Sequence, residues 1–479
     1  RDAQLSRGLG DVYKGQVMIP MDFDWLAKVL ATDYQGGNQT VKNINTDTRT
    51  LCDDEVFLAL QGPNFDGHKF VAQAKEKGAI AAIVARPVNV DIVQFVVSDT
   101  RIALGQIGAA VMAQVAPKTI AITGSVGKTT VKEMCAAILS GHGEVLATKG
   151  NFNNDIGVPL TLLRLEPQHQ YAVIELGANH IGEIAYTVAM TKPDVAVVCN
   201  VAASHLEGFG SLQGVATAKG EIYDGLKPDG VAVVNCDSDY ADFWLDKLTD
   251  RNVKLFSTSK QLDYWAEDVV LDEQARASFV LCNKDKKVPV TLALPGKHNI
   301  ANALIATALT TELGVSLESV ASALATMGEV KGRVNVLKVS DTLTVIDDTY
   351  NANVQSVKAA IDLLSDMPGR RIFALGDMGE LGEEARFYHQ QVGEYAQQKG
   401  IDELYSLGVL SKSASDVFEK PNRHFSSREQ LLQQLQSELA QSTQKTTVVV
   451  KGSRSSRMEL VVTDLVNSQQ NGNNGVSSC

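Results

Sequence analysis

The sequence lacks three features that would mark other classes of protein. No apolar run approaches the ~20 residues of a membrane-spanning helix, and the first residues do not combine a basic region with an apolar stretch. Basic residues are in the minority, with 44 Lys and Arg against 56 Asp and Glu and a formal net charge of -12. Because an acidic protein is repelled by phosphate backbones and anionic lipids, we expect no nucleic-acid partner and no membrane partner. The missing signal pattern leads us to expect no secretion.

Closely spaced cysteine pairs are also missing. The six cysteines are scattered along the chain, so neither a zinc site nor a disulfide framework is indicated. They are Cys52, Cys135, Cys199, Cys236, Cys282 and Cys479. A reducing cytoplasm fits this distribution best.

The length of 479 residues is too great for one hydrophobic core and predicts about three domains. We expect an extension foreign to the fold, three α/β domains and a frayed tail, at 1–17, 18–99, 100–331, 332–466 and 467–479. The extension shows no sustained periodicity, so Met18 or Met21 is expected to be the natural start. The tail is rich in Asn, Gln, Ser and Gly, which disfavours a packed structure.

A phosphate-binding loop is predicted between a strand at 119–123 and a helix that begins near Val131. The loop consists of Gly124, Ser125, Val126, Gly127, Lys128, Thr129 and Thr130. Its glycines allow backbone N–H groups to converge on phosphate oxygens at a helix start, and the lysine and the first threonine could contact phosphate and magnesium. The commonest form of the motif would have a glycine at Ile122, so an ordinary strand-to-helix turn is the alternative.

The segment 100–331 alternates apolar strands with helical stretches, which predicts a parallel sheet with strands at 119–123, 171–176, 195–199 and 231–235. Ligands bind beyond the carboxyl ends of such strands. Glu175 ends one apolar strand and needs a partner, either a magnesium ion or a salt bridge. His205 follows another strand at the same edge, where a histidine can be a ligand or only a hydrogen-bonding loop residue.

Three further polar residues of this segment lie in predicted helices or at their starts. Lys219 falls within a predicted helix at 212–226, and its spacing alone indicates a solvated lysine. Asn299 and Asn302 are three residues apart before an apolar helix at 303–313, so they share one face. Their amides could bind a purine edge, although Asn299 could equally cap the helix.

The third segment predicts another open, mostly parallel sheet, with strands at 344–347, 371–375, 403–407 and 447–450 and helices near 354–364, 384–399 and 427–439. Polar clusters at 347–353, 376–380 and 451–454 follow three of these strands and suggest a shared cleft. The first segment is a small α/β unit, with helices predicted at 24–30 and 69–77 and strands at 56–60 and 79–84. Its Thr48 and Arg49 are typical of a solvated turn when judged alone.

These motifs resemble the Mur ligases of peptidoglycan synthesis over 18–465. The most specific parts are 123–130, 150–159, 175–180 and 347–353. The last part resembles the members that add D-Ala-D-Ala, and the Asp-Asn-Pro-Arg string of the diaminopimelate-adding enzymes is absent. Val354 departs from the family pattern, because proline is expected there, and we expect a looser start to the following helix.

The resemblance implies a small N-terminal α/β domain that binds a UDP-linked substrate, a central P-loop ATP-binding domain and a C-terminal Rossmann-like domain. It also implies an ATP-dependent amide ligase that acts on a UDP-linked muramoyl tripeptide and D-Ala-D-Ala through an acyl phosphate. ATP and magnesium, as two ions, are the implied cofactors. We expect a monomer.

The resemblance also implies roles for individual residues. Lys128 and Arg333 would contact ATP phosphates, while Thr129, Glu175, His205 and a carbamylated Lys219 would hold magnesium. Asn299, Asn302 and Asp348 would contact the nucleotide. Substrate contacts are implied for Thr48 and Arg49 at uridine, for Asn154, Asp155 and His180 along the tripeptide, and for Tyr350, Asn351 and Asn353 in the cleft.

Two alternatives stay open. A folylpolyglutamate-synthase-like ligase shares the same plan, but folate ligases lack the uridine-binding module that the first segment resembles. A nucleotide-dependent switch or binding protein would hydrolyse ATP slowly and form no amide.

Overall fold

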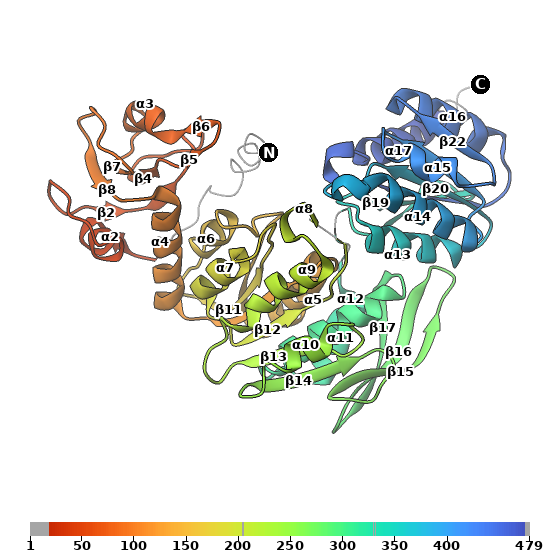
Figure 1. Cartoon of the computed structure of the whole chain (residues 1–479), viewed down its shortest axis with the longest axis horizontal. Coiled ribbons are helices and arrows are strands. Elements are labelled where there is room, and N and C mark those ends of the chain that lie inside the picture. The colour runs from red at the N-terminus through yellow and green to blue at the C-terminus, as the bar shows by residue number, and fades with distance from the viewer. Residues whose placement is uncertain (1–18, 204–205, 329, 331, 475–479) are drawn as a thin grey trace.

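The computed structural model describes residues 19–203, 206–328, 330 and 332–474. Figure 1 shows three parts, with the N-terminal part and the C-terminal part at opposite ends and the central part between and below them. The predicted extension at 1–17 and the candidate ligand His205 lie outside the described residues. Each part is built on its own mainly parallel sheet, so the predicted three-domain α/β fold class is confirmed.

The N-terminal part contains a four-stranded parallel sheet in the order β3 (Asn43–Asn45), β4 (Glu55–Leu58), β7 (Ala81–Val84) and β8 (Val93–Val96). Two short antiparallel pairs join β1 (Met21–Asp22) to β2 (Thr40–Val41) and β5 (Gln61–Gly62) to β6 (Phe65–Asp66). The predicted helices are present as α2 (Phe23–Leu30) and as a 3-10 turn, Gly67–Phe70, followed by α3 (Val71–Glu76). Helix α4 (Thr100–Val115) leads into the central part.

The central sheet has nine strands. The strands from β10 to β15 in the order given next run parallel to one another. Their order is β10 (Glu144–Ala147), β11 (His169–Glu175), β9 (Lys118–Thr123), β12 (Val195–Val198), β13 (Val231–Asn235), β14 (Asn252–Ser257), β15 (Tyr264–Leu271), β16 (Arg276–Asn283) and β17 (Lys287–Pro295). The four predicted strands are confirmed. The antiparallel ribbon from β15 to β17 was not predicted, although burial alternates along much of β17.

Alternation along the central strands explains why helices cover both faces. Ile120 and Ile122 face one hydrophobic core, while Ala121 between them faces another, as the two-residue period of a strand requires. One face is covered by α4, α6 (Gly157–Leu162), α7 (Glu183–Thr191) and α9 (Leu212–Gly220). The opposite face is covered by α5 (Lys128–Ser140), α11 (His298–Thr311) and α12 (Leu317–Thr326). Short helices α8 (Leu206–Phe209) and α10 (Ala241–Leu245) complete the central part.

The C-terminal sheet has six strands, of which only β18 runs antiparallel to its neighbour. The order is β18 (Asn335–Lys338), β19 (Leu343–Asp348), β23 (Thr446–Lys451), β20 (Arg370–Gly376), β21 (Glu403–Leu407) and β22 (Asn422–Phe425). Helices α13 (Val354–Ser365), α14 (Ala385–Gln398) and α15 (Lys412–Asp416) cover one face, and α16 (Arg428–Gln441) and α17 (Glu459–Asn474) cover the other. The predicted strands and helices are confirmed.

Two expectations about helix ends differ from the structure. Helix α17 continues to Asn474, well into the segment that was expected to fray from Asn467. The expected looseness at Val354 is wrong, because Asn353 caps α13: its side chain accepts from the N–H of Ser356, whose hydroxyl accepts from the N–H of Asn353 in return. A complete capping box therefore replaces the rigidity of a proline at the first helical position.

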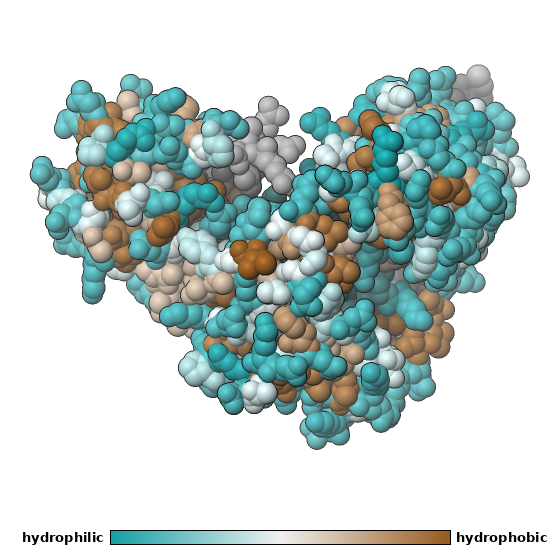
Figure 2. Space-filling view, in the orientation of Figure 1, coloured by the Kyte–Doolittle hydropathy of each residue, from teal (hydrophilic) through white to brown (hydrophobic). Residues whose placement is uncertain are grey.

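One face of the molecule is mainly polar (Figure 2). Figure 2 shows hydrophilic residues over most of one face, with hydrophobic residues in single positions and small groups. Among the helices of the described residues, none is long and apolar enough to cross a membrane.

Candidate active site

The phosphate-binding loop is present where the sequence predicts it, between β9 and α5. Gly124 and Gly127 have φ values of +152° and +83°, which side chains rarely allow. A Cβ on Gly124 would lie 2.8 Å from the Cβ of Cys199 on the neighbouring strand end. Helix α5 begins at Lys128, three residues earlier than predicted, so the N–H groups of its first turn face the loop opening.

The tip of the loop is held by Asn200, which follows β12. The N–H of Val126 donates to Asn200 Oδ1 at 2.9 Å, and Asn200 Nδ2 donates to the carbonyl of Val126 at 3.0 Å. The N–H of Ser125 donates to the backbone carbonyl of Asn200 at 3.1 Å. Sequence reasoning missed this residue, although its position directly after a buried strand at the ligand-binding edge was a usable signal.

Lys128 is folded over the loop. Its Nζ donates to the carbonyl oxygen of Gly124 at 2.7 Å. Burial lowers the pKa of Lys128 and the nearby charge of Arg333 acts in the same direction, while Glu175 opposes them. A phosphate bound in the loop would supply negative charge beside Lys128 and so favour its protonated form.

Thr129, in the first turn of the helix that follows β9, is joined directly to Glu175 at the end of the neighbouring strand β11. The Thr129 hydroxyl donates to Glu175 Oε2 at 3.0 Å, and Asn153 Nδ2 donates to the other carboxylate oxygen at 2.8 Å. The N–H of Glu175 donates to the hydroxyl of Thr148 at 3.0 Å, which fixes the strand end. Within the described residues no cluster of three His, Cys, Asp or Glu side chains could hold a metal. A hydroxyl and a carboxylate are nevertheless oxygen donors that suit magnesium, which commonly takes few protein ligands beside phosphates and water.

Lys219 is buried beside this loop, so the interpretation of a solvated lysine is wrong. Only 2% of the side chain is exposed, and its Nζ lies 5.8 Å from the centre of the Phe209 ring. Burial, reinforced by the positive charge of Lys128, lowers the pKa of Lys219 to about 7. Burial therefore favours the neutral amine, which is the form that reacts with carbon dioxide.

Of the two asparagines of α11, Asn302 lies against the loop and Asn299 contacts Asn302. Asn299 Nδ2 donates to the carbonyl of Pro295 at 2.7 Å, and Asn302 Nδ2 donates to Asn299 Oδ1 at 2.8 Å. A Cβ on Gly127 would lie 2.7 Å from Asn302 Oδ1. The capping role considered for Asn299 is wrong, because Lys297 occupies the N-cap position.

Arg333 reaches the loop from the start of the C-terminal part. Its NH2 group donates to the Thr129 hydroxyl at 3.4 Å, and its guanidinium carbon lies 4.3 Å from the centre of the Tyr350 ring. The structure therefore brings residues from both sides of the junction to the phosphate-binding loop.

Asp348 forms an ion pair that the sequence did not reveal. Its Oδ2 lies 2.5 Å from Nζ of Lys451, and both side chains are almost fully buried at the ends of adjacent strands. Of the three polar clusters expected to share a cleft, the first and third meet through this pair. The second cluster meets the third through the backbone, because the N–H of Ser453 donates to the carbonyl of Asp377 at 2.9 Å. The carboxylate of Asp377 accepts hydrogen bonds from the N–H groups of residues 409–411.

Other predicted substrate residues already have local partners. Asn353 caps α13, and Asn351 Oδ1 accepts from the N–H of Ala352 at 2.9 Å. Asn154 Oδ1 accepts from the N–H of Gly157 at 2.8 Å. Asp155 forms an ion pair with Arg101, and Nδ1 of the exposed His180 lies 3.1 Å from Glu183.

Thr48 and Arg49 lie between β3 and β4 in the N-terminal part, which Figure 1 shows apart from α5. Thr48 is buried and its hydroxyl donates to Gln73 at 3.0 Å, while the half-exposed Arg49 is paired with Asp47. The buried Glu55 shapes this turn: it accepts from Asn43 Nδ2 at 3.1 Å, Asn45 Nδ2 at 2.9 Å and the N–H of Cys52 at 2.9 Å. Sequence reasoning missed Glu55.

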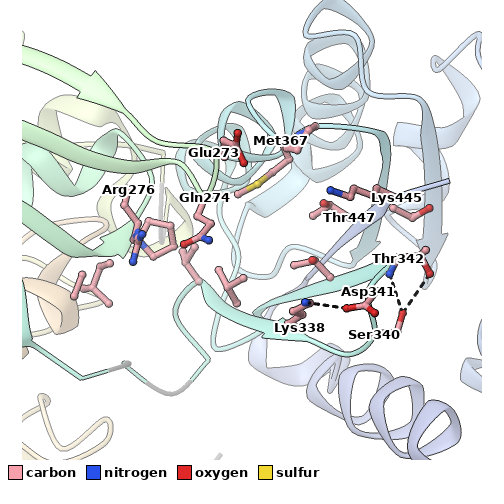
Figure 3. Close-up of a pocket in the computed structure, with 18 of the residues that line it drawn as sticks. Glu273, Gln274, Arg276, Lys338, Ser340, Asp341, Thr342, Met367, Lys445 and Thr447 are labelled. Atoms are coloured by element: carbon pink, nitrogen blue, oxygen red, sulfur yellow. Dashed lines mark hydrogen bonds and ion pairs between the residues drawn. The ribbon is translucent and has the colours of Figure 1, made fainter. Parts of the chain in front are cut away.

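A separate cavity of about 470 Å³ lies between the central and C-terminal parts. Figure 3 shows Glu273, Gln274 and Arg276 on one side and Lys445 and Thr447 on the other. Thr447 is near the start of β23, whereas Lys451 ends it, about 13 Å away at the rise of a strand. The described residues that line this cavity include none of the predicted site residues.

Three family models together match most of the chain. They are the Mur ligase family catalytic domain at 40–123, the Mur ligase middle domain at 122–310 and the Mur ligase glutamate ligase domain at 332–454. The chain is 46% identical over 456 residues to UDP-N-acetylmuramoyl-tripeptide--D-alanyl-D-alanine ligase of Escherichia coli (strain K12), covering 95% of the chain and 100% of that protein. The chain belongs to the Mur ligase family.

Solved structures of Mur ligases agree with the fold. MurF from Acinetobacter baumannii superposes with a TM-score of 0.90 at 38% identity, covering 94% of this chain and 99% of that one. MurF from Thermotoga maritima in complex with ADP has a TM-score of 0.81 at 27% identity, covering 90% and 98%. A folylpolyglutamate synthase from Mycobacterium tuberculosis has a TM-score of 0.61 at 16% identity, covering 76% of this chain and 95% of that one. At this identity the similarity shows only a shared fold.

Proposed function

We propose that the protein is an ATP-dependent ligase that joins D-Ala-D-Ala to a UDP-N-acetylmuramoyl tripeptide, giving the pentapeptide, ADP and phosphate. The observation that carries this function is the full-length similarity to ligases of that name at 46% identity. The site supports it, because a phosphate-binding loop, a buried carboxylate and two cationic side chains converge at one sheet edge.

The first step is phosphoryl transfer to the terminal carboxylate of the tripeptide. A carboxylate oxygen attacks the γ-phosphorus, the bond to the β,γ-bridging oxygen breaks, and ADP leaves with that electron pair. Because both reactants are anions, the site must neutralise charge before and during attack. Lys128, the N–H groups of the first turn of α5 and Arg333 are proposed to do so.

Thr129 and Glu175 are proposed to hold magnesium, with His205 and carbamylated Lys219 near a second ion. When bound, magnesium would screen the charges of the carboxylate and the γ-phosphate from each other. The buried, partly neutral amine of Lys219 fits carbamylation, because carbon dioxide reacts with a neutral amine. Carbamylation would change this side chain from a cation into an anion beside Lys128.

The second step forms the amide. The neutral amine of D-Ala-D-Ala attacks the acyl carbon, the bond from that carbon to the phosphate oxygen breaks, and the nitrogen loses a proton as phosphate leaves. Water would hydrolyse the acyl phosphate, so closure of the three parts around the site would protect it.

The remaining sequence-based assignments are proposed as binding contacts. Asn299, Asn302 and Asp348 would contact the nucleotide, and Thr48 and Arg49 would contact the uridine. The tripeptide and cleft contacts would be Asn154, Asp155, His180, Tyr350, Asn351 and Asn353. We further propose a cytoplasmic monomer.

The test supplies UDP-N-acetylmuramoyl tripeptide, ATP, magnesium and D-Ala-D-Ala and detects the pentapeptide by mass spectrometry. The Lys128→Ala variant is the matched control, which should release no phosphate while still binding the UDP-linked substrate. Absence of product from the wild-type protein would refute the ligase function. Product formed only from a folate and glutamate would favour the folylpolyglutamate-synthase-like alternative, and phosphate release without amide would favour a nucleotide switch.

A further inference from the structure

We propose that Tyr350 is a positioning residue that holds Arg333 over the phosphate-binding loop, and that the buried Lys451 fixes Tyr350 in place. This inference rests on the proposed function, in which Arg333 faces the transferred phosphate.

The guanidinium of Arg333 has few directional contacts with the described residues. It lies 4.3 Å from the centre of the Tyr350 ring, while its NH2 group makes a long hydrogen bond of 3.4 Å to Thr129. The Nε of Arg333 is buried and has no hydrogen-bond partner among the described residues. The face of the Tyr350 ring therefore supports this cation beside a single long hydrogen bond.

An aromatic face has an advantage over a carboxylate at this position. A carboxylate would engage the N–H donors of Arg333, which point outward in the guanidinium plane. The ring attracts the cation through its face and leaves these donors available for phosphate oxygens. Tyr350 thus orients Arg333 without competing with ATP.

The backbone of Tyr350 is tied to the same short segment. Its N–H donates to the carbonyl of Gly332 at 3.1 Å, next to Arg333 in the chain. Gly332 has a φ of +68°, and a Cβ there would lie 3.3 Å from the Cβ of Tyr350. The ring and the peptide of Tyr350 therefore contact two successive residues at the junction of the central and C-terminal parts.

Lys451 fixes the chain on both sides of Tyr350. Its Nζ, in a side chain that is 1% exposed, donates to Asp348 Oδ2 at 2.5 Å and to the carbonyl of Asn351 at 3.0 Å. The register of β19 and β23 places Asp348 directly beside Lys451. Movement of the C-terminal sheet would therefore carry Tyr350, and with it Arg333, relative to Thr129.

The test is a double-mutant cycle on kcat/KM for ATP with Tyr350→Leu and Arg333→Ala. Tyr350→Leu removes the ring face and should lower kcat/KM by about tenfold. Tyr350→Phe keeps the ring and should recover most of that loss. In the Arg333→Ala background, Tyr350→Leu should cause no further loss, because the ring acts through Arg333.

Tyr395→Leu is the matched control. Its ring also lies beside cations, 5.3 Å from Lys358 Nζ and 5.2 Å from Lys399 Nζ, but on α14. This variant should leave kcat/KM for ATP unchanged. Lys451→Met should reproduce the loss seen in Tyr350→Leu without adding to it; if that variant does not fold, the Tyr350 and Arg333 cycle still decides the main inference.

The outcomes separate this inference from the proposed function. Additive losses in the double variant, or a Tyr350→Phe enzyme as impaired as Tyr350→Leu, would overturn the role of Tyr350 while leaving the ligase function intact. An Arg333→Ala enzyme with full activity would instead refute the proposed role of Arg333. Absence of pentapeptide from the wild-type protein would refute the ligase function itself.

Discussion

Asn200 holds Val126 at the tip of the phosphate-binding loop through two hydrogen bonds, of 2.9 Å from the backbone N–H and 3.0 Å to the backbone carbonyl. The loop has only two residues between its glycines. The side chain of Asn200, just after β12, pairs with the second of them, Val126, as a neighbouring strand backbone would. The shape of the loop therefore depends on β12 as well as on Gly124 and Gly127.

We predict that Asn200→Ala raises the KM for ATP by about tenfold, because two hydrogen bonds at ~0.5–1.5 kcal/mol each are lost. Steady-state phosphate release at varied ATP concentration measures the change. Asn283→Ala is the control, since Asn283 holds only a turn of the antiparallel ribbon. An unchanged KM in Asn200→Ala would show that the loop keeps its shape without this side chain.

Lys219 provides a chemical test of carbamylation. We predict that Lys219→Ala lowers the rate of phosphate release by about 10²-fold, because the carbamate anion proposed to support the magnesium site is lost. A short carboxylic acid such as acetate should partly restore phosphate release by replacing the missing anion. Lys219→Arg fills the space with a permanent cation, so acetate should not restore it. A Lys219→Ala enzyme with the wild-type rate would refute the proposed role.

Replacement of Glu55 should selectively weaken binding of the UDP-linked substrate. Asn43 Nδ2 and Asn45 Nδ2 donate to different oxygens of the Glu55 carboxylate. In Glu55→Gln, the amide nitrogen would face one of these two donors, so the turn that carries Thr48 and Arg49 should shift. The KM for the UDP-linked substrate should rise several-fold while the KM for ATP stays constant. Glu76→Gln, at the exposed end of α3, is the control. Equal increases in both KM values would indicate a general loss of structure instead.

His389 predicts a pH dependence of stability. Its Nε2 accepts from the N–H of Met378 at 2.9 Å, and its Nδ1 lies 2.6 Å from the carbonyl of Ala385, so the ring must be neutral with a proton on Nδ1. Burial lowers the pKa of His389 from its ordinary value of 6.5. The unfolded chain then binds more protons just below pH 6.5, and the free energy of unfolding should fall as the pH falls through that range.

Urea unfolding at pH 7.5 and at about pH 5.5 would measure this effect. His389→Gln should lower stability at the higher pH and weaken the pH dependence. His142→Gln, at an exposed position, should keep the wild-type dependence. The same slope in His389→Gln as in the wild type would assign the effect to other groups.

Local patterns were sufficient for much of the fold. Buried strands such as β9 and β13 are short apolar runs next to turn residues, and amphipathic helices such as α13 follow them, so their positions can be read from neighbouring residues. The phosphate-binding loop is equally local, because its glycines, Lys128 and Thr129 are adjacent in the chain. The antiparallel ribbon escaped prediction because its weak alternation competes with the stronger βα pattern around it.

The sequence by itself determined the three α/β parts, the phosphate-binding loop and the family, because these depend on residues that are close together in the chain. Only the tertiary structure decided that Lys219 is buried, that Asn200 shapes the loop, and that Tyr350 supports Arg333. The paired atoms in such contacts come from distant segments, as Lys451 and Asp348 do at a separation of 103 residues. Whether a charge is solvated or buried depends on which segments the fold brings together, and the spacing of residues along the chain does not contain that information.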